Sequence, residues 1–264
     1  MAREQTTIET IDEVFAKTLL GEYDDDAPWE AVRELQAIGT QEIFDKSVEW
    51  CRSTDPLKRA RAADVIAQLG KTADHPEHAF PEDSFIVIAS LIKIEAEPAP
   101  LSSAIHALGH IGNPRSVRIL SPFRMHPDAG VRFASAFALG KFADDLMAVD
   151  ALIKLSRDGD EDVRDWATFG IGALSQSDTP AIREVLFARL GDQFEDARQE
   201  AIVGLVRLRD ERVLTALLFA LEQDDVPAIM IDAALDLLGL SESAANWTSA
   251  RCAAELREKF GLSQ

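Results

Sequence analysis

The sequence predicts an all-α protein, a right-handed α-solenoid of about seven helical hairpins with a capping helix at each end. The first reason is a repeat, because segment 128–140 (DAGVRFASAFALG) returns 32 residues later as segment 160–172 (DEDVRDWATFGIG). The second reason is helical periodicity outside the repeated motif, since an apolar stripe runs along segment 213–221. A unit of this length is one helical hairpin, which cannot bury its apolar face unless neighbouring units stack on it.

An acidic residue precedes the second helix in most copies of the unit. Aspartate suits that place because its carboxylate accepts backbone N–H bonds at a helix start. The longest interval between these markers contains segment 71–81, which holds two prolines and two histidines, and there we expect an inserted loop. The markers are Asp24, Asp55, Glu97, Asp128, Asp160, Phe194 (beside Glu195) and Asp224, at intervals of 31, 42, 31, 32, 34 and 30 residues.

Each hairpin is expected to pair one helix of small residues with one bulkier helix. Small residues such as Ala134, Ala136, Ala138 and Gly140 let neighbouring helices approach closely. The bulkier helix should present one buried stripe. We expect such stripes at Val213, Leu214, Leu217, Leu218 and Leu221, and again at Leu146, Val149, Leu152, Ile153 and Leu155.

The pattern extends along nearly the whole chain, so we expect a single domain over residues 1–264. No segment rich in Gly, Ser or Pro separates two parts of the sequence. Stacked repeats leave an apolar face at each terminus, which a capping helix can cover. Segment 6–20 is predicted as the opening helix. Segment 243–260, which mixes apolar and charged residues, is predicted as the closing helix.

The motif Asp-x-x-Val-Arg, followed by an Ala-rich run and Leu-Gly, resembles the short HEAT-like repeats of the phycobilisome lyase type. The resemblance covers nearly the whole chain, and the copies at Asp128 and Asp160 match it most closely. It implies a ladder of Arg and Asp side chains between repeats. The copies that lack the arginine have Pro28, Leu101 or Ala228 in its place. Such repeats serve enzymes, chaperones and scaffolds alike, so the resemblance is specific for fold and weak for function.

The arginines of the two central copies are expected to act structurally. Arg132 and Arg164 occupy the same phase of successive repeats. A catalytic arginine would have no reason to recur with the period. We therefore expect each guanidinium to bond an Asp or a backbone carbonyl of an adjacent turn or repeat.

Composition limits the classes of partner. The chain has 27 Lys and Arg residues against 46 Asp and Glu, a formal net charge of −19. This balance argues against nucleic acid, which needs clustered cationic side chains, and it suits a protein partner with basic residues. The first ten residues do not form a secretory signal, and no segment approaches the roughly 18 apolar residues of a membrane span. Cys51 and Cys252 lie too far apart in a solenoid for a disulfide, so we expect a cytoplasmic protein with no membrane partner and leave its oligomeric state open.

No motif in the sequence points to catalysis. There is no phosphate-binding loop, Gly-x-Ser-x-Gly elbow or His-Glu-x-x-His zinc site. His106 and His110 have the i, i+4 spacing that can place two imidazoles on one metal, but no further ligands stand at a recognised spacing. We interpret them as surface or groove histidines and expect no catalytic residue, metal or cofactor.

The candidate binding residues are aromatic. In repeats of this kind the second helix normally lines the concave side, and the positions one and five after the arginine phase are usually polar. Here those positions are Trp29 and Arg33, Ala60 and Asp64, Ser102 and His106, Phe133 and Phe137, Asp165 and Phe169, Gln199 and Val203, then Ile229 and Ala233. The central copies are therefore apolar where solvent is expected. The predicted partner-binding residues are Phe133, Phe137, Trp166 and Phe169, flanked by His106, His110, Lys141 and Asp165.

Three interpretations of these aromatics remain open. The leading one is a non-catalytic interaction scaffold whose concave face grips a partner polypeptide, because exposed apolar patches usually mark binding sites. In another, the aromatics are ordinary core residues. The resemblance implies the third, a bilin lyase, isomerase or tetrapyrrole chaperone. There the aromatics would stack on the ligand, Asp165 would pair with pyrrole N–H groups and His106 would transfer protons.

Overall fold

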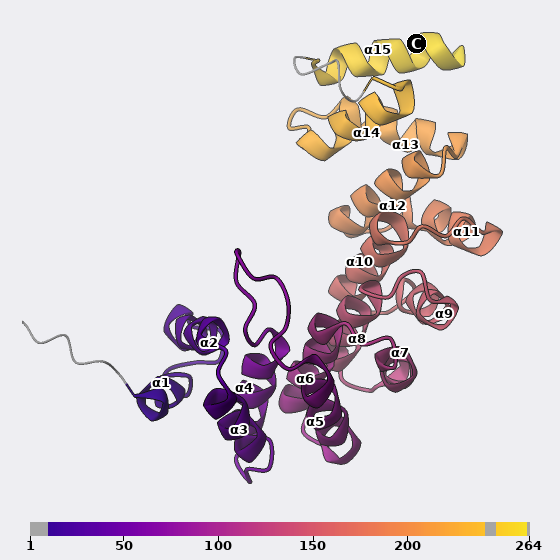
Figure 1. The fold of residues 1–264 in the computed structure, drawn as a ribbon. Coiled ribbons are helices and arrows are strands. Elements are labelled where there is room, and N and C mark those ends of the chain that lie inside the picture. The colour runs from indigo at the N-terminus through magenta and orange to yellow at the C-terminus, as the bar shows by residue number, and fades with distance from the viewer. Residues whose placement is uncertain (1–9, 241–246, 263–264) are drawn as a thin grey trace, which may run out of the picture. The chain divides into compact units, whose positions relative to one another are not determined.

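The computed structural model describes residues 10–240 and 247–262, and in these ranges the regular elements are all helices. Figure 1 traces them in chain order. They pack into two compact units, Met1–Ala138 and Leu139–Gln264. Within the described ranges, no helix is long and apolar enough to cross a membrane.

Unit 1 is built from consecutive hairpins. The helix that follows each marker packs beside its predecessor, α2 on α4 and α4 on α6, while α1, α3 and α5 each pack on the next helix in the chain. The unit contains α1 (Ile11–Lys17), α2 (Asp26–Ile38), α3 (Gln41–Trp50), α4 (Pro56–Ala67), α5 (Pro81–Ile94), α6 (Pro98–Ile111), α7 (Ser116–Leu120) and the 3-10 turn η1 (Ser121–Met125), and α8 (Ala129–Gly140) ends across its boundary.

Unit 2 repeats the same arrangement. Helix α12 lies between α10 and α14, α11 packs on α12, and the last helix packs on both α13 and α14. The elements are α9 (Leu146–Leu155), α10 (Glu161–Phe169), the π-helical turn η2 (Gly170–Leu174), α11 (Pro180–Arg189), α12 (Glu195–Arg207), the 3-10 turn η3 (Glu211–Val213), α13 (Leu214–Leu221), α14 (Ala228–Leu238) and α15 (Ser249–Phe260). We call α2, α4, α6, α8, α10, α12 and α14 the marker helices.

The ends and the long connection have these bounds. Residues 6–9 of the predicted opening helix and 243–246 of the predicted closing helix lie outside the described residues. Residues 68–80 connect α4 to α5, and Figure 1 shows this connection as a loop that projects from the helices of unit 1. The imidazole of His78 lies 2.7 Å from the carbonyl oxygen of Ile66, so the loop is anchored to the end of α4.

The acidic markers cap some helices and miss others. Asp55 and Asp160 are the N-caps of α4 and α10 and accept the backbone N–H of Leu57 and Val163. The N-cap of α2 is Asp25, one residue after the marker. Its carboxylate makes no capping bond to α2 and instead accepts the Glu22 N–H of the preceding turn.

Helix α14 begins only after Pro227, three residues past the marker at Asp224. A proline disfavours the helical conformation in the residue before it, so α14 does not extend back through Val226.

Small residues set the closest helix contacts. A methyl group built on Gly109 would lie 2.8 Å from the Cα of Ala138, and one built on Gly204 would lie 2.7 Å from the Cα of Gly172. At such distances a side chain would force the helices apart. The prediction of close packing at small residues is therefore confirmed where α6 meets α8 and where η2 meets α12.

The predicted apolar stripes are buried except at Leu146 and at Ile153, which is half-buried. The stripe along segment 213–221 is buried, as are Val149, Leu152 and Leu155. Leu146, however, is 79% exposed, and that part of the prediction is wrong. The N-cap residue Asp145 bonds the N–H groups of the first turn, so α9 starts at Leu146 and its first side chain faces solvent.

The repeated arginines are structural, as predicted. Arg164 donates from Nε and Nη2 to the two carboxylate oxygens of Asp192, both at 2.9 Å, and from Nη1 to the carbonyls of Asp158 and Gly159. Its guanidinium thus ties α10 to the loop before it and to the acid 28 residues further on, which is one rung of the expected ladder.

The same arginine geometry recurs in other repeats. Arg132 donates to the carbonyls of His126 and Pro127, and Arg198 donates to those of Asp192 and Gln193. In each case the acceptors lie six and five residues before the arginine. In the α4 repeat, Arg59 bonds the Ser53 carbonyl and both oxygens of Glu95. The arginine is therefore part of the hairpin geometry in these repeats.

Candidate functional site

A pocket of about 400 Å³ lies on the marker-helix side of unit 1. Its volume falls within the range of about 300–1,000 Å³ that is usual for ligand sites. The lining comes from the turn before α2 and from α2, α4 and α6. The residues are Tyr23, Trp29, Gln36, Asp64, Ala67, Gln68, Ala99, Ser102, Ser103, His106 and His110.

A hydrogen-bonded network forms the base of this pocket. The Tyr23 hydroxyl donates to Oδ2 of Asp64 at 2.8 Å and lies 2.8 Å from the Ser103 hydroxyl. Arg61 lies behind this group with a side chain that is 1% exposed, and its Nη1 is 3.5 Å from the same carboxylate oxygen. Three elements of unit 1 therefore meet at one carboxylate.

Arg61 fixes the turn that carries Tyr23. Its Nε donates to the Thr18 carbonyl at 2.9 Å and its Nη2 to the Tyr23 carbonyl at 2.7 Å. The guanidinium carbon lies 4.0 Å from the centre of the Tyr23 ring and 5.1 Å from that of Trp29. These contacts hold both aromatic rings in place at the wall of the pocket.

Burial shifts the pKa values of the groups in the pocket. It raises the pKa of Asp64 to about 6, although the hydrogen bond from Tyr23 acts in the opposite direction. It lowers the pKa of His106 to about 4, with a further contribution from His110. Burial and the Asp64 charge raise the pKa of Tyr23. At neutral pH the pocket therefore holds an ionised Asp64, a neutral His106 and a protonated Tyr23.

The predicted aromatic residues of unit 1 adjoin this pocket. The Phe137 ring centre lies 4.8 Å from that of His106 and 5.2 Å from that of His110. The Phe133 ring centre lies 5.9 Å from that of His106. Both phenylalanines are half-buried. Four of the eight predicted binding residues thus form one cluster on α6 and α8.

The other four predicted residues belong to unit 2. Trp166 and Phe169 meet edge to face with ring centres 5.8 Å apart, and both are half-buried. Lys141 is exposed and Asp165 is half-buried. The joining of both groups into one surface stays a prediction.

The acidic groups beside the unit 2 aromatics repel one another. Burial, followed by the charges of Asp196, Asp162 and Asp192, raises the pKa of Asp165 to about 6. Burial and the charges of Asp165 and Asp196 raise the pKa of Glu200 to about 7. One oxygen of Asp165 is buried with no hydrogen-bond partner among the described residues.

Sequence reasoning placed Trp29 and Asp64 at groove positions but missed Tyr23, Arg61 and Ser103. Tyr23 lies in a turn outside the repeated motif, which explains why periodicity could not find it. A signal was present in α4, where Arg61 and Asp64 are polar residues three apart in an otherwise small and apolar run. Two residues three apart lie on the same side of a helix, so their side chains can contact each other.

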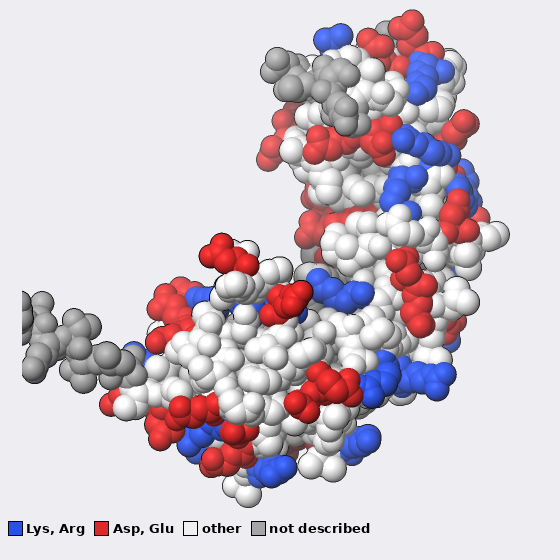
Figure 2. All heavy atoms as spheres, in the orientation of Figure 1, with Lys and Arg blue, Asp and Glu red and all other residues white. Residues whose placement is uncertain are grey.

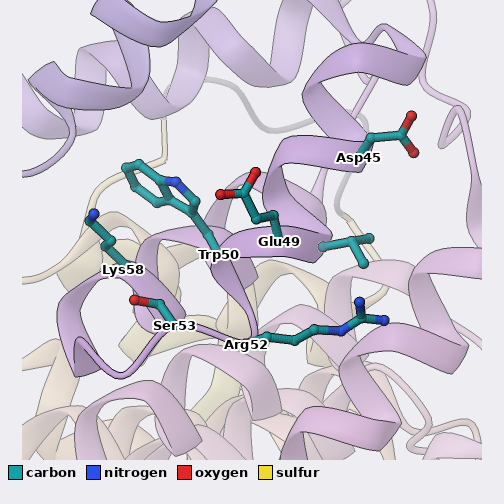
Figure 3. A pocket seen from close by; sticks show the side chains of 7 residues that line it. Asp45, Glu49, Trp50, Arg52, Ser53 and Lys58 are labelled. Atoms are coloured by element: carbon teal, nitrogen blue, oxygen red, sulfur yellow. The ribbon is translucent and has the colours of Figure 1, made fainter.

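A second hollow of about 460 Å³ lies between α3 and α4 (Figure 3). Lys58 Nζ lies 5.3 Å from the centre of the Trp50 ring, and Glu49, Asp45 and Arg52 also face the hollow. Its mixed charges give it no single ligand preference. Among the described residues, no group of three or more His, Cys, Asp or Glu side chains is placed to hold a metal ion.

The chain belongs to the HEAT-repeat family. The family model for HEAT repeats matches residues 87–172 and 149–239, which together cover more than half of the sequence. The match begins within α5 and ends after α14, so the motif and the helical hairpins give the same assignment.

Comparison with known proteins adds relatives of two kinds. Protein YibA of Escherichia coli K12 is 28% identical over 213 residues, 78% of this chain and 74% of YibA. The X-ray structure of Escherichia coli YibA is similar with a TM-score of 0.72 at 23% identity, over 97% of this chain and 93% of that one. The phycocyanobilin lyase subunit alpha of Thermosynechococcus vestitus is 29% identical over 105 residues, 40% of this chain and 37% of the lyase subunit.

Proposed function

We propose that this chain is a non-catalytic scaffold that binds a partner polypeptide on the side formed by its marker helices. The observation that carries the proposal is the cluster in unit 1, where half-buried Phe133 and Phe137 adjoin a pocket of about 400 Å³. Aromatic side chains bury a large area and lose few rotamers on binding, so they are effective anchors in protein interfaces.

The half-burial of these rings supports binding over a core role. The core phenylalanine Phe15 is 1% exposed and packs on Trp50, whereas Phe133 and Phe137 keep part of their surface in contact with solvent. Partly exposed rings beside a pocket offer apolar area on which another molecule can pack. We extend the proposed surface to Trp166 and Phe169 in unit 2, flanked by Lys141 and Asp165.

Charge suggests the character of the partner. Acidic side chains appear on both units in the view of Figure 2, and the chain carries a net charge of −19. Such a field accelerates association with a positively charged molecule and disfavours nucleic acid. We propose a polypeptide with basic residues around its contact segment.

The test is affinity capture of the partner from the native cell lysate, followed by binding measurements on two variants. Phe137→Ser should weaken the affinity by about 30-fold, which corresponds to about 2 kcal/mol for an interface anchor. The matched control Phe219→Ser removes a ring on α13 that is 67% exposed, and it should bind as the wild type does. A loss of about 3–5 kcal/mol of stability in Phe137→Ser would instead assign that ring to the core.

A second candidate function follows from the likeness to the phycocyanobilin lyase subunit. In that case the aromatic cluster would stack on a bilin, with Asp165 pairing to pyrrole N–H groups and His106 transferring protons. Mixing the purified protein with phycocyanobilin should then change the visible absorption and induce circular dichroism in the chromophore bands. A captured polypeptide without a bound chromophore, and an unchanged bilin spectrum, would favour the scaffold.

A further inference from the structure

The base of the unit 1 pocket offers hydrogen-bond acceptors. An ionised carboxylate can only accept, so the Tyr23 hydroxyl proton points to Oδ2 of Asp64, 2.8 Å away. The Tyr23 hydroxyl then has no second proton to donate to Ser103, 2.8 Å away, so the Ser103 hydroxyl donates to the Tyr23 oxygen. Both hydroxyl protons are taken up inside the network, so the oxygens of Tyr23, Ser103 and Asp64 offer lone pairs to a bound molecule. A ligand can bond to these oxygens only as a donor.

The charges at the base offset one another. Arg61 and Asp64 are both buried, and the guanidinium is already bonded to two backbone carbonyls as well as facing the carboxylate. His106 is neutral at pH 7 because burial lowers its pKa to about 4. The Lys71 ammonium bonds the carbonyl of His110, whose residue lines the pocket. A charged ligand would be desolvated here without a free counter-ion, so an uncharged one fits better.

The walls are suited to a flat ring. Trp29 stands edge to face against Tyr23, with ring centres 5.7 Å apart, and His106 presents its imidazole from α6. Ala67, Ala99 and Ser102 keep the space between these rings open. Aromatic rings pack favourably in such offset and edge-to-face arrangements.

We propose that this pocket binds a tryptophan or tyrosine side chain of the partner polypeptide, whose ring N–H or O–H donates to the acceptors around Asp64. The inference rests on the proposed scaffold function and names the residue type that this part of the surface recognises. The basic residues of the partner would lie outside the pocket, around this uncharged anchor.

The experiment compares three small probes on the full chain by two-dimensional ¹H–¹⁵N NMR. N-acetyltryptophanamide should shift the amide signals of Ser102, Ser103 and His106 and the indole signal of Trp29. Its analogue methylated on the indole nitrogen has nearly the same shape and the same two amide groups but lacks the ring N–H donor, and it should bind about tenfold more weakly. N-acetyllysinamide, a cation, should bind more weakly than the tryptophan probe.

Variants locate the site and test the acceptor. Ala99→Phe places a ring in the pocket from an exposed position in the first turn of α6, so it should abolish binding while keeping the fold. Asp64→Asn should reduce the tenfold preference to about threefold or less. Asp83→Asn, which removes an exposed carboxylate of α5 outside the pocket, should behave as the wild type.

Several outcomes would overturn the proposal. These are equal affinity for the two tryptophan probes, tighter binding of the lysine probe, or signal shifts that persist in Ala99→Phe. Binding of the captured partner to the variants distinguishes this proposal from the scaffold function. If Phe137→Ser loses the partner and Ala99→Phe keeps it, the pocket assignment fails and the scaffold function stands.

Discussion

Replacing Arg164 with alanine should destabilise unit 2 by about 2–3 kcal/mol. The substitution removes two charge-assisted hydrogen bonds to Asp192, whose side chain is 2% exposed, and two bonds to loop carbonyls. Removing one partner of a buried ion pair typically costs about 3–5 kcal/mol, because the other charge stays behind. Here Asp192 keeps Arg189 at 2.8 Å and the Phe194 N–H at 3.0 Å, so we place the loss below that range.

The assay is thermal and denaturant unfolding followed by circular dichroism. At about 2–4 °C per kcal/mol for a chain of this size, the expected drop in Tm is roughly 4–12 °C. Arg164→Lys keeps the charge but cannot bridge both carboxylate oxygens in the fork geometry, so its loss should be intermediate. Arg118→Ala, at an exposed position on α7, is the matched control and should leave Tm within about 1 °C.

The result that refutes this reasoning is an Arg164→Ala protein that melts with the wild type and no longer binds its partner. That outcome would make the repeated arginine a binding residue. Equal losses in Arg164→Ala and Arg118→Ala would also contradict it, because the effect would then be a general one of surface charge.

Two further predictions concern unit 2. Gly204→Ala should destabilise the protein by about 1–3 kcal/mol despite the better helix propensity of alanine, because the new methyl would meet Gly172 Cα at 2.7 Å. The control is Gly140→Ala, where the nearest atom is 3.5 Å away, and it should be neutral or slightly stabilising in the same melting assay. Glu200 has a folded pKa of about 7, above the value of 4.5 of an unperturbed glutamate, so the folded state binds the extra proton and the free energy of unfolding falls as pH rises between these values. Glu200→Gln should therefore stabilise the protein at pH 8, on the order of 1 kcal/mol after solvent screening, and give no gain at pH 4; a gain that is the same at both pH values would contradict this assignment.

The sequence predicts the helical repeats well because each copy must solve the same packing problem. The Arg164 bridge and the close Gly172 and Gly204 contact both follow from residues that keep their phase. Leu146 shows the limit of an apolar stripe as a burial signal, since the stripe takes no account of where a helix begins.

The binding pocket was only partly predictable for a related reason. His106 and Phe137 were found because they occupy repeat positions that are normally polar. Tyr23 and Arg61 were not found, because their contact joins a turn to a helix 38 residues further on and no period relates them.

The Arg61 contacts also make the pocket depend on the packing of α1 and α2. Thr18 and Tyr23, whose carbonyls Arg61 holds, lie between α1 and α2, the first hairpin. Stability is not uniform along a repeat protein, and single units can open while the rest of the fold stays intact. When this hairpin opens, Tyr23 and Trp29 leave and the pocket ceases to exist. By linkage, any molecule bound there must lower the population of the open state of this hairpin, so slower hydrogen exchange in α1 and α2 would report occupancy of the site.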